Sequence, residues 1–304
     1  MFIIKHKTLF VSISATLVIL SIIALGVFGL KIGIDFKGGS LIEVNYTGAR
    51  PVQSELFQGV NALDFGSVLI QSAGDKEYIV KTRDLSDTEH SSMLSALSEN
   101  GKYPLTEVNF TSIGPSVGHQ LAEKAIIAII LVVFAIIFFI AFAFRKVSRP
   151  VSSWKYGLIA IIALIHDVTI PTVIFALFSK LYGVEVDTLF VVALLTILGL
   201  SVSDTIVIFD RIRENLRNNK QAERGGFSEI VGKSLDQSFT RSLATSLSVI
   251  LALLALFFFG PSSTKYFSLV LVAGMFFGTY SSIFLASPLL VFTEEWQRRK
   301  KSKQ

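Results

Sequence analysis

The sequence predicts an α-helical polytopic membrane protein, with six transmembrane helices and a small α+β domain between the first and second helices. Hydrophobic residues make up 51% of the 304-residue chain and charged residues only 17%, whereas soluble domains carry about 25% charged residues. Six apolar stretches are long enough to cross a bilayer, which takes about 20 residues each. One polar segment, residues 31–124, is long enough to fold as a domain.

The predicted transmembrane helices cover residues 10–30, 125–144, 156–178, 188–209, 238–260 and 266–292. Lys5 and Lys7 precede the first helix, as they would in a signal peptide. Its apolar run is longer than the roughly 7–15 residues of a signal h-region, so an uncleaved anchor is expected. The fifth apolar run is short, and the polar residues before it are expected to complete that span.

The placement of basic residues predicts the orientation of the chain. If six helices alternate, the N-terminal segment 1–9, the loop after the second helix, the loop 210–237 and the tail 293–304 share one side. The basic residues of these segments are Lys5, Lys7, Arg145, Lys146, Arg149, Lys155, Arg211, Arg213, Arg217, Lys220, Arg224, Lys233, Arg298, Arg299, Lys300, Lys301 and Lys303. The short loops on the other side contain Lys180 and Lys265. Basic loops favour the cytoplasm, so both termini are expected there, with residues 31–124 outside.

The polar segment has the pattern of a ferredoxin-like domain. Strands are expected at residues 40–46, 67–72, 77–82 and 105–113, and helices at residues 52–63 and 86–100. Apolar and polar residues alternate between Ile42 and Tyr46, as in a half-buried strand. Ser86 and Glu89 have the spacing of a helix capping box. The resulting β-α-β-β-α-β order is the split βαβ arrangement.

Composition excludes several function classes. The chain has no cysteine and four histidines, so neither a disulfide framework nor a metal-ligand constellation is expected. The isoelectric point near 9.3 does not indicate nucleic-acid binding, because the basic residues lie at the ends of apolar runs. No hydrolase triad or nucleotide-binding motif is found. We therefore expect no enzymatic activity, no catalytic residues, no metal and no cofactor.

Three ionisable residues within the predicted spans are candidates for function, because such groups are costly in lipid. They are Asp167 in the third helix, Asp204 in the fourth and Arg241 at the start of the fifth. Asp204 and Arg241 are expected at similar depths and would pair if their helices are neighbours. A carboxylate beside a guanidinium stays ionised and loses that preference when the two separate. The three residues are therefore predicted to form a proton relay.

Structural roles for the same residues remain open. Asp204 and Arg241 would also suit a fixed ion pair, and the long Arg241 side chain would also suit snorkelling to the interface. A hydrogen bond from Asp167 that joins the third and fourth helices is as good an interpretation as proton transfer. His166 is expected to be a packing residue. Polar residues continue along two helix faces, which are Ser201, Asp204 and Thr205 in the fourth helix, and Gln237, Arg241 and Thr245 in the fifth.

Two glycine motifs flank the predicted domain. Gly33, Asp35, Phe36, Gly38 and Gly39 directly follow the first helix, and residues 114–118 precede the second. Paired glycines allow turns and close packing, and Asp35 is suited to cap such a turn. The first motif lacks the spacing of a phosphate-binding loop. Both motifs are interpreted as connectors between helix and domain.

These motifs resemble the SecF branch of the SecD/SecF family, within the resistance–nodulation–division superfamily. The resemblance covers residues 5–296. Its specific elements are residues 33–39, 114–118, 166–167, 203–215 and 237–242. Ser203 departs from the family pattern, in which Asn is frequent before the aspartate, and this leaves the carboxylate of Asp204 unchanged.

The resemblance implies a subunit of the bacterial inner membrane that works with SecD. Such a pair uses the proton motive force to assist preprotein passage through the SecYEG channel, after the ATP-driven stage. By the resemblance, Asp204 binds the proton, Arg241 is its charge partner and Asp167 is a further contributor. Unfolded preprotein is the implied substrate, and YajC and YidC are further candidate partners.

The topology independently implies a second subunit. Transporters of this superfamily use two six-helix halves related by pseudo-symmetry, and this chain has one half without an internal repeat. Two other functions remain open. One is a proton-coupled half-transporter for lipids or small molecules, and the other is a non-catalytic membrane scaffold.

Overall fold

The computed structural model describes residues 2–143, 151–218 and 226–302, and it divides the chain into two compact units. The helical unit contains Met1–Leu30, Ala128–Val184 and Leu189–Gln304, and the α+β domain contains Lys31–Ile127 and Glu185–Thr188. Six of the basic residues used to predict orientation lie outside the described residues. They are Arg145, Lys146, Arg149, Lys220, Arg224 and Lys303.

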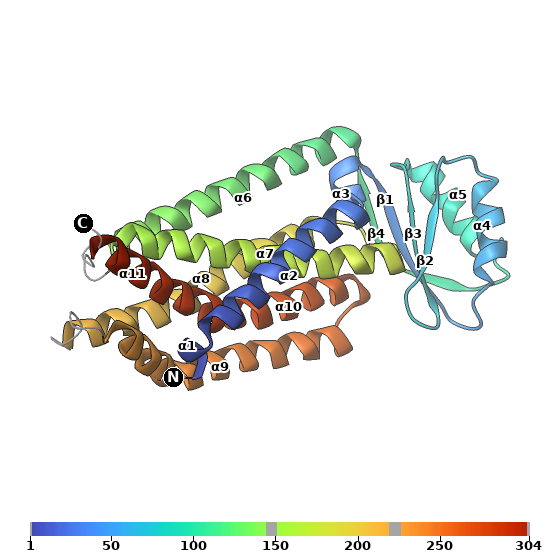
Figure 1. Cartoon of the computed structure of the whole chain (residues 1–304). Coiled ribbons are helices and arrows are strands. Elements are labelled where there is room, and N and C mark those ends of the chain that lie inside the picture. Colours follow the sequence, from blue (N-terminus) through green and yellow to red (C-terminus); the bar gives the residue numbers. More distant parts are fainter. Residues whose placement is uncertain (1, 144–150, 219–225, 303–304) are drawn as a thin grey trace. The chain divides into compact units, whose positions relative to one another are not determined.

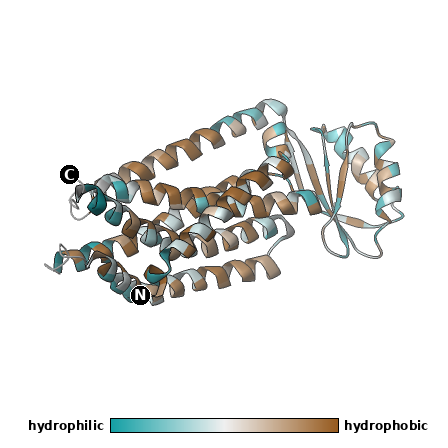
Figure 2. Cartoon of the chain, viewed as in Figure 1, coloured by the Kyte–Doolittle hydropathy of each residue, from teal (hydrophilic) through white to brown (hydrophobic). Residues whose placement is uncertain are grey.

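Long apolar helices build the helical unit (Figure 1). After the short α1, Phe2–Lys5, its helices are α2, Lys7–Phe28; α6, Pro115–Ala143; α7, Ser153–Tyr182; α8, Thr188–Asn218; α9, Phe227–Phe259; α10, Lys265–Ser281; and α11, Ser287–Lys301. A π-helical turn, Ser282–Ala286, joins α10 to α11. Hydrophobic residues predominate along these helices (Figure 2). By length and composition, six helices within the described residues suffice to cross a membrane, with α10 and α11 counted as one.

The segments predicted as a cytoplasmic loop, residues 210–237, and a basic tail, residues 293–304, are largely helical in the described part of the chain. Within residues 210–237, α8 continues to Asn218 and α9 begins at Phe227, with Gly226 as its N-cap. The two extensions bind each other through side chains, since Arg211 and Asn215 both donate to Gln237 Oε1 at 2.8 Å. The tail expected from residue 293 is likewise helical to Lys301, as part of α11.

The α+β domain has the predicted element order. Its elements are α3, Ile34–Lys37; β1, Gly39–Tyr46; α4, Gln53–Asn61; β2, Leu69–Ser72; β3, Glu77–Thr82; α5, Asp87–Leu97; and β4, Leu105–Ile113. The sheet has the order β2-β3-β1-β4, and its neighbouring strands are antiparallel. This is the ferredoxin-like arrangement predicted from the sequence.

The domain core lies between the sheet and helices α4 and α5. The buried alternating residues of β1 and β3 meet Leu56 and Val60 of α4 and Met93 and Leu97 of α5. Two tyrosines in this core satisfy their hydroxyl groups on helix ends and loops. Tyr46 donates to the carbonyl of Leu97 at 2.9 Å, and Tyr78 donates to the carbonyl of Pro51 at 3.0 Å.

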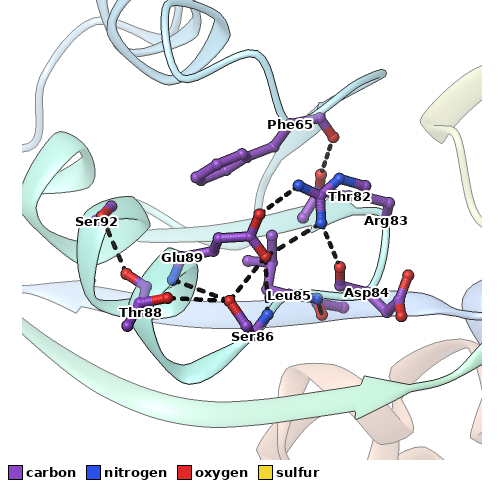
Figure 3. Close-up of polar contacts among 10 residues, drawn as sticks. Phe65, Thr82, Arg83, Asp84, Leu85, Ser86, Thr88, Glu89 and Ser92 are labelled. Carbon is purple, nitrogen blue, oxygen red and sulfur yellow. Dashed lines mark hydrogen bonds and ion pairs between the residues drawn. The ribbon is translucent and has the colours of Figure 1, made fainter.

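The predicted capping box at the start of α5 is present and extends to an arginine (Figure 3). Glu89 Oε2 accepts from the backbone nitrogen of Ser86 at 2.9 Å and from its hydroxyl at 3.0 Å. Arg83 forms an ion pair with the same carboxylate. Hydrogen bonds from Arg83 and Ser86 lower the pKa of Glu89 to about 2, from the usual 4.5.

This cap predicts an acid-sensitive start of α5. Because the pKa of Glu89 is depressed in the folded state, its stabilising contribution is present above pH 4.5 and is lost as the pH falls towards about 2. Hydrogen-exchange protection factors of the α5 amides should therefore decrease through this window in the full chain. In Glu89→Gln, protection should be lower at neutral pH and flat across the window. An unchanged acid profile in Glu89→Gln would contradict the prediction.

A local measurement is needed because another carboxyl group acts in the opposite direction. Burial, and then the neighbouring Glu77, raise the pKa of Glu43 on β1. Glu43 therefore favours the folded state at low pH, and this contribution weakens as the pH rises. The global stability of the domain sums both effects.

Candidate functional site

Asp167 is held at the centre of the helical unit by donors from its own helix and from two others. It lies on α7, and its side chain is fully buried. Ser281 of α10 donates to Asp167 Oδ2 at 2.7 Å, and Ser201 of α8 donates to the same oxygen. His166 Nδ1 lies 2.8 Å from Asp167 Oδ1. The hydrogen bond expected between the third and fourth helices is therefore confirmed, and a third helix joins it.

Asp204 is held by hydroxyl groups of two other helices. Thr279 of α10 donates to Asp204 Oδ2 at 3.1 Å, and Ser246 of α9 donates to it at 3.3 Å. The hydroxyl oxygens of Ser246 and Thr279 also lie within hydrogen-bond distance of each other. Asp204 is only half-buried, in contrast to Asp167. The carboxylate of Asp204 is thus oriented from within the unit but remains accessible on one side.

The structure does not bring Asp204 and Arg241 together. The Arg241 side chain is exposed on α9, and no ion pair of the described residues joins it to Asp204. The physical reason is the rotation of α9 about its axis. Ser234, Ser238, Ser242 and Ser246 form the buried stripe of this helix, whereas Gln237, Arg241 and Thr245 lie one position away on its exposed side. The expected pair is therefore replaced by a hydroxyl cradle.

Close packing of α10 against α8 assembles this site. Gly274 and Gly278 form a GxxxG motif, which allows helices to approach closely in membranes. A Cβ atom at Gly274 would lie 2.2 Å from Ile197 Cγ1, and one at Gly278 would lie 3.3 Å from Ser201 Cβ. The approach lets Ser201 and Ser281 reach the same oxygen of Asp167 from opposite helices.

The π-helical turn lies next to the same site. Ser282, its first residue, is 2.8 Å from the hydroxyl of Thr205 on α8. Single π-helical turns inside α-helices are frequent at functional sites. Such a turn also interrupts the regular α-helical hydrogen bonding of the backbone, and here it lies between α10 and α11.

Buried polar atoms without a partner lie beside the aspartates. Among the described residues, His166 Nε2, the hydroxyl of Tyr280 and the hydroxyl of Ser242 are buried and have no hydrogen-bond partner. The rings of His166 and Tyr280 are stacked at 5.9 Å. Buried polar groups normally find a partner in protein or water, so this region has spare capacity for hydrogen bonding. His166, which was expected to be a packing residue, thus packs on Tyr280 and also contacts the carboxylate of Asp167.

The sequence interpretation missed the donors from the sixth helix. Thr279, Ser281 and Ser282 were visible as a polar cluster in an apolar span, which is the same signal that identified Asp167 and Asp204. Within the described residues no group of three or more His, Cys, Asp or Glu side chains is placed to hold a metal ion. The arrangement is thus two carboxylates linked to hydroxyl groups, which suits storage and transfer of a proton.

Removing one donor tests the importance of the Asp167 cluster. Ser281→Ala deletes the hydrogen bond to Asp167 Oδ2, and hydrogen bonds between membrane helices contribute about 0.6 to 1.7 kcal/mol. We expect the free energy of unfolding in detergent to fall by about that amount, measured by denaturant titration. Ser302→Ala is the control, because the exposed Ser302 hydroxyl, just after α11, donates to the nearby carbonyl of Arg299. Equal stability of the two variants would contradict the prediction.

The glycine motif after α2 lies in the α+β domain. Gly39 has φ +144°, and a Cβ atom there would lie 2.5 Å from the carbonyl oxygen of Thr82. Gly38 packs against the start of α6, where a Cβ atom at Gly118 would lie 2.7 Å from the Gly38 nitrogen. Phe36 is half-buried. The expectation that Asp35 caps its own turn is wrong, because its carboxylate instead accepts from the backbone nitrogen of Thr188.

Comparisons with family models and with known proteins all identify the same family. The model of the "Protein export membrane protein SecD/SecF, C-terminal" family matches residues 93–296, and that of the "SecD/SecF GG Motif" matches residues 23–49. "Protein translocase subunit SecF" of Thermobaculum terrenum is 42% identical, over 96% of this chain and 93% of its own length. The protein of the same name from Anaerolinea thermophila is 35% identical, over 97% of this chain and 95% of its own length.

A solved structure has the same fold. The crystal structure of SecDF from Thermus thermophilus, described as a translocon-associated membrane protein, matches with a TM-score of 0.81 and 29% identity. The match covers 97% of this chain but only 38% of the SecDF chain. With family models and close relatives over most of its length, this chain belongs to the SecF proteins, the multi-pass membrane translocase subunits of the SecD/SecF family.

Proposed function

We propose that this chain uses the proton gradient across the bacterial inner membrane to assist protein export, as one half of a complex with SecD. It acts on unfolded preprotein at the SecYEG channel, after the stage driven by ATP. YajC and YidC are further candidate partners. The proton motive force is the energy source, so no cofactor is required.

One observation carries the proton part of the proposal. Two aspartates lie within the apolar helical unit, and hydroxyl groups from neighbouring helices donate to each of them. Hydrogen bonds to a carboxylate favour its charged form, whereas an apolar environment favours its protonated form. A small movement of α10 changes the donors of both aspartates together, because Thr279 and Ser281 are only two residues apart. Helix movement and proton binding are thereby coupled.

The exposed face of α9 supports a partner subunit. Arg241 and Thr245 lie there beside large apolar side chains such as Leu243 and Leu247. A guanidinium group facing lipid within a span is unfavourable, so this face is expected to be covered by protein. The solved SecDF chain, of which this chain matches 38%, is long enough to include a second half. Arg241 therefore acts in the proton relay at the surface shared with SecD, rather than by pairing with Asp204 inside this chain.

The orientation follows the basic residues. Both termini are placed in the cytoplasm and the α+β domain in the periplasm, where it meets preprotein that emerges from the channel. The two alternatives make different predictions. A proton-coupled lipid transporter acts on lipid rather than on preprotein, and a scaffold functions without the gradient.

The test separates the ATP-driven stage from the later one. In inverted membrane vesicles, a preprotein is arrested part-way through the channel, ATP is removed, and completion of transport is followed with and without a proton gradient. Vesicles with this chain and SecD are expected to complete transport only when the gradient is present. Vesicles without this chain should not respond to the gradient. Equal completion after collapse of the gradient would overturn the proton proposal, and failure of SecD to copurify would overturn the partnership.

A further inference from the structure

Residues Glu185–Thr188, which follow α7 and include the first residue of α8, belong to the α+β domain rather than to the helical unit. Its backbone pairs with the strand-like residues after α2. Val186 donates to the carbonyl of Lys31 at 2.7 Å, and Gly33 donates to the carbonyl of Val186 at 2.8 Å. This forms a parallel bridge between Ile32 and Val186, and Val186 is buried.

Two charged side chains reinforce this attachment. Lys81 on β3 forms an ion pair with Glu185 at 2.9 Å, and both side chains are largely shielded from solvent, with exposures of 15% and 19%. Asp35 Oδ2 accepts from the backbone nitrogen of Thr188 at 2.8 Å. The attachment therefore involves both the glycine motif and the sheet, two separate parts of the domain.

The Asp35 contact acts on the first turn of α8. Thr188 is the first residue of this helix, and the leading backbone N–H groups of a helix have no partner within it. A carboxylate there satisfies one such donor and interacts favourably with the positive end of the helix dipole. Asp35 is thus a helix cap supplied from a distant part of the sequence.

The same helix contains the candidate proton site. Asp204 follows Thr188 by sixteen positions within the continuous helix α8, which is a rise of about 24 Å along the axis. A continuous helix is stiff along its axis, so a shift at Asp204 reaches Thr188. The domain also encloses the start of α6, where Gly118 packs on Gly38. The glycine motif therefore contacts the starts of two helices, α6 and α8, in addition to connecting α2 to the domain.

We propose that Asp35 is a positioning residue, whose contact with Thr188 couples movement of α8 to movement of the α+β domain. This inference rests on the proposed function, because it assigns the route from the proton site to the domain that meets preprotein. In this proposal the contacts between Glu185–Thr188 and the rest of the domain are permanent. They stay formed throughout the working cycle, while α8 and the domain move together.

The absence of cysteine from the sequence permits a direct test. Ile32→Cys and Val186→Cys place two thiols at the bridge, where paired residues lie within reach of a disulfide. In vesicles of the complex with SecD, the oxidised double variant is expected to retain full gradient-dependent transport. The disulfide joins residues that, in this proposal, remain in contact throughout the cycle. If oxidation stops transport and dithiothreitol restores it, the attachment has to open and the proposal is wrong.

Asp35 itself is tested in the same background. Asp35→Ala with the thiols reduced is expected to lower gradient-dependent transport about fivefold, the usual effect of one lost helix cap on a local equilibrium. Oxidation should restore transport by replacing the contact with a covalent link. Asp35→Asn retains an acceptor oxygen and should keep most of the activity. Full activity of reduced Asp35→Ala, or no recovery on oxidation of a protein that still binds SecD, would overturn the proposal.

Two further variants keep the outcomes distinct. If Asp35→Ala fails to assemble with SecD, Lys81→Met takes its place, with recovery on oxidation as the same criterion. Asp204→Asn is measured in parallel. If it also retains gradient-dependent transport, the proposed function fails. If it is inactive while reduced Asp35→Ala is fully active, only the coupling inference fails.

Discussion

Asp204→Asn is expected to abolish gradient-dependent completion of transport, leaving the level seen when the gradient is collapsed. The amide has nearly the same shape and still accepts hydrogen bonds from Thr279 and Ser246 through its oxygen, so the helical unit should assemble. It has no proton to exchange in this pH range, so the gradient has nothing to act on. The measurement is transport in vesicles with and without a proton gradient, together with recovery of SecD on purification.

Asp210→Asn is the matched control on the same helix. Asp210 has an exposed side chain, and its ion pair with Arg213 on the next turn is long, at 3.7 Å. Exposed pairs of this kind contribute little, so transport should be unchanged. Loss of transport in both variants would indicate a general effect on α8. Normal transport in Asp204→Asn would remove the central support for proton coupling and favour the scaffold alternative.

Local chemistry explains why the α+β domain was predictable from the sequence. β3 and β4 have the predicted bounds, Glu77–Thr82 and Leu105–Ile113, because alternation and turn residues act within a few positions. The cap at Ser86 was visible for the same reason. The hydrogen bond between Arg211 on α8 and Gln237 on α9 was not predictable in the same way, because the two residues are distant in the sequence.

The candidate site was predictable in its carboxylates but not in its partners. Ionisable residues in apolar spans stand out in any sequence, so Asp167 and Asp204 were found. The spacing of polar residues on α9 gave two adjacent stripes, and charge favoured the one with Arg241. Packing instead buries the serine stripe that ends at Ser246. A membrane helix has apolar residues on all of its faces, so the sequence pattern does not identify the face that packs inside the protein. That face depends on the neighbouring helices.

The rotation and spacing of these helices depend on Gly274, so a small substitution there should have a large effect. In Gly274→Ala the added methyl group would lie 2.2 Å from Ile197 Cγ1 and 2.4 Å from its Cδ1. Overpacking of this kind costs about 1–3 kcal/mol. It should also move α10 away from α8, so that Ser281 and Ser201 no longer reach Asp167 together. Both the free energy of unfolding in detergent and gradient-dependent transport are expected to decrease.

A compensating substitution distinguishes a local clash from a general defect. Ile197→Ala removes the atoms that collide with the new methyl group, so it should cost less stability and transport in the Gly274→Ala background than in the unchanged chain. Gly199→Ala on α8 is the control, because no atom lies within 4 Å of a Cβ there, and it should be neutral. Contacting residues give non-additive effects in a double-mutant cycle. Strict additivity of Gly274→Ala and Ile197→Ala would mean that the approach of α10 to α8 does not set the geometry around Asp167.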